Sequence, residues 1–309
     1  MTSGRSEAGP PAGELIAALL TRCDFPPAGT AVTCAVSGGA DSLALLVLAV
    51  EAGCRATAVH VDHGLRPGSA GEAEVVRAAA DRCGAAFRGV RVAVEPGSNL
   101  EARARAARYA ALPAGVLTGH TADDQAETML LNLLRGAGLD GLAGMDPRSR
   151  PLRRLRRRET RALCETLGLT PVEDPTNRDS AFRRNRIRHE LLPLLDDIAE
   201  RDVVPILARQ TDLARDDVAL LDELSAAVDP CDARALVAAP APLARRAVRR
   251  WLRTGGPGGD ELHPPDGASV DRVLAVARGE AVACELPGGW RVARSRGRLR
   301  LDRRRGPLA

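Results

Sequence analysis

A short segment rich in glycine and hydroxyl groups, residues 37–42 (SGGADS), has the most specific chemistry in this sequence. It follows an apolar run and precedes a helical pattern, so it predicts a turn between a strand and a helix. Backbone N–H groups in such a turn and at the helix N-terminus bind anions, and glycine lets a phosphate approach closely. The chain contains no lysine and no GxGxxG pattern, which excludes a Walker loop and the common dinucleotide loop. The segment predicts a different kind of phosphate site.

Ionisable side chains follow two further predicted strands. His60 lies at the end of the apolar run 55–61, and Asp124 and Glu127 open the helical pattern 121–135. Two carboxylates at this spacing share one face of a helix, where they can hold Mg²⁺ opposite the phosphate loop. Taken alone, acidic residues in a first turn would also be explained by the helix dipole.

Strand and helix patterns alternate along the first half of the chain. Strands are predicted at 30–36, 55–61, 88–94 and 115–118, and helices at 14–22, 41–52, 69–83, 99–112 and 121–135. This succession predicts an α/β fold with a parallel, Rossmann-like sheet covered by helices on both faces. Such sheets bind ligands beyond the carboxyl ends of their strands, which is where the polar segments fall.

The pattern becomes mainly helical after residue 135. Helices are predicted at 159–167, 182–195, 203–226, 241–254 and 269–277, followed by a hairpin that turns at Pro287-Gly288-Gly289. We expect a disordered tail at 1–12 and a catalytic domain at 13–215. A smaller, mainly helical domain that binds substrate, with the terminal hairpin, is expected at 216–309.

The basic residues are all arginine, and they cluster. The formal net charge is only +4, but residues 148–161 and 291–305 are dense in arginine. Two such clusters suit a polyanion, although either one alone would be explained as a solvated face.

Cysteine and apolar patterns narrow the class of protein further. The seven cysteines stand singly without a CxxC pair, which argues against a disulfide framework, a zinc site or an iron–sulfur cluster. No stretch has the length and apolarity of a membrane span, and the N-terminus shows no signal-peptide pattern. We therefore expect a cytoplasmic protein without a membrane partner.

Six segments together resemble one enzyme family. SGGADS, HVDHGLR, NLEARARAARY, GHTADDQAETMLLNLLRGAGLDGLAGM, VEDPTNRD and FRRNRIRHELLPLL occur in the order and spacing of the tRNA(Ile)-lysidine synthetases, which are PP-loop ATP pyrophosphatases. The resemblance covers residues 31–195 and continues more weakly into the final hairpin. It implies a ligase that uses ATP and Mg²⁺ to attach free L-lysine to C2 of the wobble cytidine of tRNA(Ile) with anticodon CAU. An adenylated cytidine intermediate, release of AMP and pyrophosphate, and a switch from AUG to AUA reading are implied as well.

The resemblance also implies roles for individual residues. The residues expected to be catalytic are Asp41, Asp124, Glu127 and Arg188, with Asp41 and Asp124 as Mg²⁺ ligands and Asp124 and Glu127 as alternative partners of the lysine ammonium. The residues expected to bind ATP are Ser37, Gly38, Gly39, Ala40, Asp41, Ser42, His60, Gly119 and His120. The arginines expected to contact tRNA phosphates are Arg153, Arg154, Arg157, Arg183, Arg184, Arg249 and Arg250. In one departure from the family, Thr121 stands where many members have a second histidine.

Three other functions are weighed against this one. A PP-loop tRNA thiolase would use paired cysteines or an iron–sulfur cluster, and the isolated cysteines speak against it. An amide-forming PP-loop ligase that acts on small molecules would leave the arginine clusters unexplained, and the chain shows no N-terminal nucleophilic cysteine or glutaminase segment. An adaptor that binds nucleotide or RNA without turnover is a different class, and the presence of both the phosphate loop and the acidic helix speaks against it. The sequence is also compatible with a homodimer.

Overall fold

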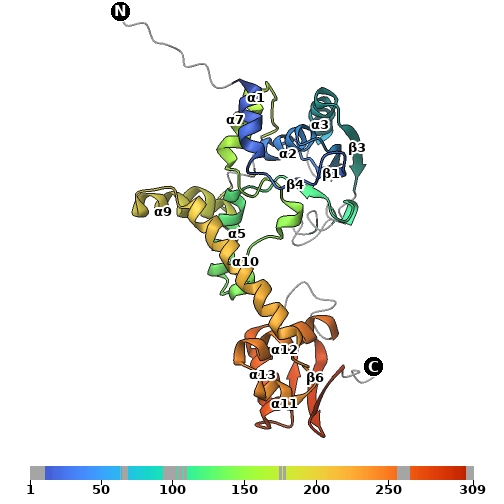
Figure 1. Cartoon of the computed structure of the whole chain (residues 1–309), viewed down its shortest axis with the longest axis vertical. Helices are drawn as coiled ribbons and strands as arrows, with labels where there is room; N and C mark the ends of the chain where they lie inside the picture. The colour runs from blue at the N-terminus through green and yellow to red at the C-terminus, as the bar shows by residue number, and fades with distance from the viewer. Residues whose placement is uncertain are drawn as a thin grey trace, which may run out of the picture. The chain divides into compact units, whose positions relative to one another are not determined.

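The computed structural model describes residues 11–62, 64, 69–92, 103, 107, 110–173, 176, 179–255 and 265–303. The chain divides into two compact units, Met1–Leu213 and Ala214–Ala309, each taken by itself below (Figure 1). The sequence places this boundary after residue 215, within the same long helix. Of the tail predicted at 1–12, residues 1–10 lie outside the described residues, and Ala12 already belongs to helix α1 (Ala12–Leu20).

The N-terminal unit is built on a four-stranded parallel sheet in the order β3-β2-β1-β4 (Figure 1). The strands are β1 (Ala31–Ala35), β2 (Arg55–Asp62), β3 (Ala86–Arg91) and β4 (Leu117–Thr118). In the register of the sheet, Val32 of β1 pairs with Ala56 of β2, and Cys34 of β1 pairs with Leu117 of β4. The predicted α/β fold with a parallel sheet is confirmed. β3 begins earlier than the strand predicted at 88–94.

Helix α2 (Ala40–Glu51) is enclosed by other elements. Every residue from Ser42 to Ala49 is buried, as expected of a helix whose sequence is apolar on all sides. It packs against β1, β2 and α7 (Arg157–Thr166) and also contacts α3 (Ser69–Cys83). Because α2 and α3 touch each other and the sheet, they cover the same face of it. The helix predicted at 99–112 lies mostly outside the described residues, so the covering of the second face stays a prediction.

A second core of this unit is formed by helices that follow the sheet. It joins α5 (Ala122–Leu134) to the segment made of α8 (Arg183–Arg186), the π-helical turn η3 (Ile187–Leu191) and α9 (Leu192–Ala199). The short elements α6 (Leu139–Leu142) and η1 (Pro147–Ser149) connect α5 toward α7. The helix predicted at 182–195 is present as a continuous helical run that begins at residue 183, but it contains a π-helical turn that the sequence does not predict. Pro193 lies at the start of α9 and has no N–H to donate, so the regular helix is interrupted just before it.

The C-terminal unit combines helices with a small antiparallel sheet in the order β5-β6-β7. Its elements include most of α10 (Val204–Ala226), then α11 (Ala233–Ala238), α12 (Ala241–Gly255), α13 (Gly267–Arg278), β5 (Ala283–Leu286), η4 (Pro287–Gly289), β6 (Trp290–Ser295) and β7 (Arg298–Arg303). The predicted hairpin at residues 287–289 is present, with Gly288 and Gly289 at positive φ. Helix α11 and strand β7 are not predicted from the sequence.

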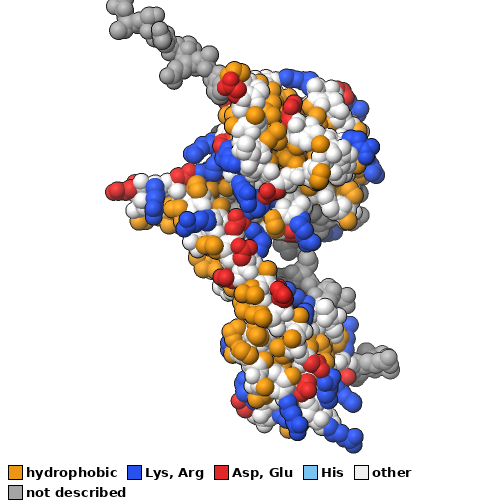
Figure 2. Space-filling view, viewed as in Figure 1, with side chains coloured by type: hydrophobic (Ala, Val, Ile, Leu, Met, Phe, Trp, Pro, Cys, Tyr) orange, Lys and Arg blue, Asp and Glu red, His pale blue; other side chains and the backbone are white. Residues whose placement is uncertain are grey.

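The surface of this C-terminal unit carries both signs of charge. On the face shown in Figure 2, its arginine side chains are interspersed with acidic ones. In the described part of the chain, no helix combines the length and apolarity needed to cross a membrane.

Position 119, at the turn between β4 and α5, requires a glycine because the backbone of Asp41 lies very close to it. A Cβ at this position would lie 2.7 Å from the carbonyl carbon of Asp41, at the start of α2. Gly119→Ala is therefore expected to lower the free energy of unfolding by roughly 1–3 kcal/mol, because the backbone must shift. Urea unfolding measures this. The control is Gly71→Ala in helix α3, where a Cβ meets nothing within 4 Å and is expected to cause no loss. Equal stability of the Gly119 variant and the unmodified protein would contradict the requirement.

Candidate active site

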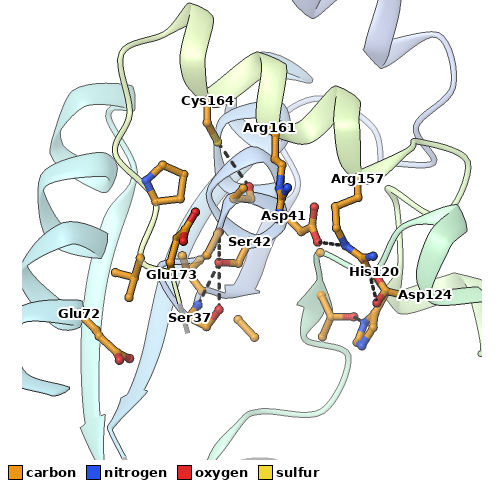
Figure 3. Close-up of a pocket in the computed structure, with 18 of the residues that line it drawn as sticks. Ser37, Asp41, Ser42, Glu72, His120, Asp124, Arg157, Arg161, Cys164 and Glu173 are labelled. Atoms are coloured by element: carbon orange, nitrogen blue, oxygen red, sulfur yellow. Dashed lines mark hydrogen bonds and ion pairs between the residues drawn. The ribbon is translucent and has the colours of Figure 1, made fainter. Parts of the chain in front are cut away.

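A cavity of about 840 Å³ opens at the carboxyl ends of β1, β2 and β4. Residues 37 and 39–42 of the phosphate loop line it, together with Gly119 and residues of α5, α7 and η3 (Figure 3). Its position agrees with the rule that parallel sheets bind ligands beyond the carboxyl ends of their strands. Most of the predicted site residues therefore meet in one place.

The phosphate loop is held by its own serines. The Ser37 N–H donates to Ser42 Oγ at 3.1 Å, and Ser42 Oγ donates to the Gly39 carbonyl at 2.8 Å. Gly38 has φ of +90°, and Gly39 precedes α2 without any side-chain cap. The first N–H groups of α2 are consequently available to an anion.

Asp41, within the phosphate loop, belongs to a network of three carboxylates and three arginines. Arg157 of α7 donates to Asp124 at 2.9 Å and to Glu127 at 3.0 Å, and it lies 3.4 Å from Asp41. On the other side, Arg184 donates to Glu127 at 2.8 Å and to Asp124 at 3.0 Å, and Arg188 donates to Glu127 at 2.7 Å. Glu127 is fully buried. Three formal negative and three formal positive charges therefore offset one another at this end of the cavity.

The two aspartates of the network have opposite acidities. Burial raises the pKa of Asp41 to about 6, and the neighbouring Asp124 contributes, while Arg157 and a hydrogen bond from Thr160 only partly offset this rise. Burial also opposes ionisation of Asp124, but Arg157 and Arg184 hold the pKa of Asp124 well below its usual range. Asp124 is thus a permanent anion, whereas Asp41 changes charge near neutral pH.

His60 and His120 line the cavity, and the buried Thr121 lies beside Asp124. His60 is buried, and its Nδ1–H donates to the Val36 carbonyl at 2.9 Å, whereas its Nε2 has no partner among the described residues. His120 Nδ1 lies 2.8 Å from Thr118 Oγ1. Thr121 is the N-cap of α5, and both its N–H and its hydroxyl donate to Asp124 Oδ2, at 2.8 and 3.0 Å. Thr121 therefore positions Asp124.

The arginines predicted to contact tRNA are in different surroundings. Arg157 and Arg184 belong to the buried network, and Arg153 pairs with Asp24 and Asp212. Arg154 and Arg183 are exposed, Arg250 donates to Ser225, and Arg249 is half-buried. The structure thus brings Arg157 and Arg184 to carboxylates rather than to an open surface. The tRNA assignments stay predictions.

The carboxylates offer Mg²⁺ little room in this arrangement. Among the described residues, no three side chains of His, Cys, Asp or Glu form a group that would hold a metal ion. Both oxygens of Asp124 already accept hydrogen bonds, from Thr121, Arg157 and Arg184. Asp41 lines the cavity beside the phosphate loop, which fits Mg²⁺ that arrives on nucleotide phosphates with one or two protein carboxylates as ligands. Both oxygens of Asp41 also accept hydrogen bonds, from Arg157 and Thr160, so the assignments of Asp41 and Asp124 as Mg²⁺ ligands both stay predictions.

Residues of α7 are missing from the sequence-based site. Thr160 donates to Asp41, Arg161 lines the cavity, and Cys164 Sγ lies 3.5 Å from the Ala40 carbonyl. The only signal for these residues in the sequence is that they share one helix face with Arg157. The sequence itself presents Arg157 and Arg161 as part of a basic cluster, so this signal does not indicate a site.

Two family models match this chain. A PP-loop domain covers residues 16–195, and a TilS substrate binding domain covers residues 232–300. Together with the parallel sheet and the loop at residues 37–42, the first match defines the N-terminal unit as a PP-loop domain, an ATP-binding fold.

Curated relatives narrow the class further. The chain is 46% identical over 303 residues to the tRNA(Ile)-lysidine synthase of Nocardia farcinica, covering 90% of this chain and 94% of the relative. It is 45% identical over 274 residues to that of Mycolicibacterium paratuberculosis, covering 82% and 84%. The chain belongs to the tRNA(Ile)-lysidine synthase family, which confirms the resemblance seen in its motifs.

A solved structure shares the fold. The U34-tRNA thiolase NcsA from Methanococcus maripaludis, with its [4Fe-4S] cluster, is similar with a TM-score of 0.52 and 16% identity. The likeness covers 67% of this chain and 78% of the thiolase. At this identity it shows the fold alone.

The two loop glycines are expected to separate folding from ligand binding. Gly39 has an ordinary φ of −72°, and a Cβ there would meet only Ser37 Oγ, at 3.7 Å. Gly39→Ala should leave the free energy of unfolding within about 0.5 kcal/mol but weaken ATP binding, because the new methyl group hinders the approach of a phosphate. Gly38→Ala should cost roughly 1–2 kcal/mol of stability, because its φ is positive. Thermal unfolding and ATP titration test both, and unaltered ATP binding by Gly39→Ala would contradict a phosphate at this loop.

The raised pKa of Asp41 predicts a pH-dependent stability. A carboxyl whose pKa rises from 3.8 to about 6 on folding favours the folded state below pH 3.8, and this contribution is lost as the pH rises through 6. Asp41→Asn cannot ionise, so from pH 4 to pH 7 it should gain up to about 3 kcal/mol relative to the unmodified protein. Urea unfolding in EDTA-containing buffers measures the difference. A difference that stays constant over this range would contradict the raised pKa.

Proposed function

We propose that the protein forms lysidine on tRNA(Ile) by attaching free L-lysine to C2 of the wobble cytidine of the CAU anticodon. ATP is converted to AMP and pyrophosphate, and the modified anticodon reads AUA in place of AUG. The observation that carries the proposal is one cavity, in a chain of this family, that is lined both by the phosphate loop and by the carboxylates of Asp41 and Asp124, each paired with Arg157. We place the activity in the cytoplasm, where tRNA is modified.

The reaction needs two successive displacements. C2 of cytosine is a poor electrophile because its oxygen is a poor leaving group. Attack of that oxygen on the α-phosphorus of ATP expels pyrophosphate and links AMP to the base. The lysine amine then attacks C2, the bond from C2 to oxygen breaks, AMP departs with that oxygen, and the amine loses a proton. The cavity must hold nucleotide, base and amine together.

The phosphate loop is suited to hold the leaving pyrophosphate. The N–H groups at the start of α2 and the Ser37 hydroxyl are neutral donors that an anion could accept from, while the Ser42 hydroxyl, which donates to the Gly39 carbonyl, holds the loop in shape. Mg²⁺ held by Asp41 would supply positive charge to the phosphates. His60, whose Nε2 accepts no hydrogen bond from any residue that the structure describes, and His120 line the same cavity and would face the nucleotide.

The network is suited to hold the amine substrate. Asp124 and Glu127 are the anions that an ammonium group would contact, and it would compete there with Arg157 and Arg184. Arg188 lies at the rim of the cavity and would stabilise negative charge on phosphate or base. Exposed arginines, including Arg154 and Arg183, would position the tRNA through its phosphates without reading its sequence.

A thiolase is less well supported by the cysteines. Burial raises the pKa of Cys164, which lines the cavity, to about 11, and burial raises the pKa of Cys34 to about 12. Sulfur transfer through a cysteine needs the thiolate, which these values disfavour at neutral pH. An adaptor would bind ATP and tRNA in the same cavity without turnover, so only a measurement of turnover separates it from an enzyme.

The test is pyrophosphate release from ATP with an unmodified tRNA(Ile) transcript bearing CAU, with and without L-lysine. We expect release that depends on this tRNA, and a mass gain on the wobble cytidine only when lysine is present. Asp41→Asn should lower the rate by roughly a hundredfold or more, the range in which one catalytic group contributes. Asp81→Asn, an exposed aspartate on α3, is the matched control and should keep the rate.

Other outcomes separate the alternatives. Release that requires tRNA but leaves the mass of the cytidine unchanged with lysine would point to another base modification. Binding of ATP and tRNA without any release would favour the adaptor.

A further inference from the structure

Three arginines line the cavity in the described part of the chain, and they differ in their partners. Arg157 and Arg188 are bound to the carboxylates of the network. Arg161 forms no ion pair and no hydrogen bond through its side chain with any residue that the structure describes. It is also exposed, so its charge is open to a ligand that enters the cavity.

The face of α7 that carries Arg161 is fixed against the start of α2. Arg157 and Thr160 contact the Asp41 carboxylate, and Cys164 lies against the Ala40 carbonyl. Arg161 lies between these contacts, one helical turn after Arg157 and about one turn before Cys164, on the same face of the helix. Figure 3 shows its side chain extending from α7 toward Asp41 and Ser42. Its guanidinium is therefore directed at the phosphate loop by a helix held on both sides of it.

The loop itself supplies no formal positive charge. Its donors are N–H and hydroxyl groups, and the chain has no lysine that could reach a phosphate. A polyphosphate brings several negative charges, which neutral donors bind less strongly than a cation does. A guanidinium also matches phosphate oxygens with two parallel hydrogen bonds.

We propose that Arg161 binds the polyphosphate of ATP at the phosphate loop and holds the departing pyrophosphate. The proposal rests on the proposed function for the identity of the nucleotide. The competing explanation is a solvated helix surface in which Arg161 pairs with Glu165, one turn further on. Within the described residues no such ion pair forms, although Glu165 also lines the cavity.

The experiment compares Arg161→Gln with Arg158→Gln. Arg158 lies on the same helix and is exposed, pairs with Asp202 at 3.5 Å, and is not among the residues that line the cavity. Isothermal titration with ATP, pyrophosphate and adenosine, each with Mg²⁺ at one fixed salt concentration, measures three dissociation constants. Arg161→Gln is expected to weaken ATP and pyrophosphate by roughly tenfold to a hundredfold, the range for a hydrogen bond to a charged group, and to leave adenosine unchanged. Arg161→Lys should fall between, because it keeps the charge but loses the fork, and Arg158→Gln should stay within about twofold of the unmodified protein.

Each other result is decisive. Unchanged pyrophosphate and ATP binding by Arg161→Gln would overturn the proposal while leaving lysidine formation by the unmodified protein intact. Equal weakening by Arg161→Gln and Arg158→Gln would overturn it too, because the effect would then be one of general charge. Lack of ATP binding by the unmodified protein would instead remove the proposed function. Circular dichroism controls for folding. If Arg161→Gln does not fold, the dissociation constants of Arg161→Lys for ATP and pyrophosphate test the proposal in its place, and unchanged constants would overturn it.

Discussion

The mutual neutralisation of Asp41, Asp124 and Glu127 by three arginines is the constraint around which the N-terminal unit is arranged. The six side chains come from α2, α5, α7 and the continuous segment of α8 and η3, so four segments distant in sequence must meet for each charge to find a partner. Removing one member of a buried ion pair leaves an uncompensated charge at a cost of about 3–5 kcal/mol. The network therefore has two effects. It holds α2, which packs on the sheet, against the helices that follow the sheet, and it places charged groups at the cavity.

Its composition also separates two kinds of electrostatic behaviour within one site. Arginine keeps its proton at any physiological pH, so the positive half of the network is constant. Asp124 stays ionised because Arg157 and Arg184 lower its pKa. Asp41, at the phosphate loop, has a raised pKa, so its charge changes with pH and with the arrival of a cation. The charge at the phosphate end of the cavity thus varies with pH, whereas the charge at the α5 end is constant.

Local patterns in the sequence were enough to predict the sheet, the loop and the acidic helix, because each is set by residues close together in the chain. The partners of Arg157 were not predictable in this way. Arg157 lies 116 residues from Asp41, and in the sequence it looks like part of a basic cluster suited to a polyanion. Thr121 is a similar case: in the sequence it is only a departure from the family pattern, whereas in the structure its side chain and its backbone N–H both donate to Asp124. Tertiary pairing, rather than composition, decides what these charges do.

The π-helical turn η3 sets which face of α9 meets the core. Such a turn holds one residue more than an α-helical turn, and if the same residues were wound as a regular α-helix, all of α9 would turn by about 100°. Leu192 would then leave the core that it shares with Ala126 and Leu130, although nothing about its own side chain had changed. Leu194, two residues further on, is exposed in the present arrangement. The choice between the buried and the exposed face of α9 is thus made by the winding of the backbone before the helix begins, and not by the side chains of α9 alone.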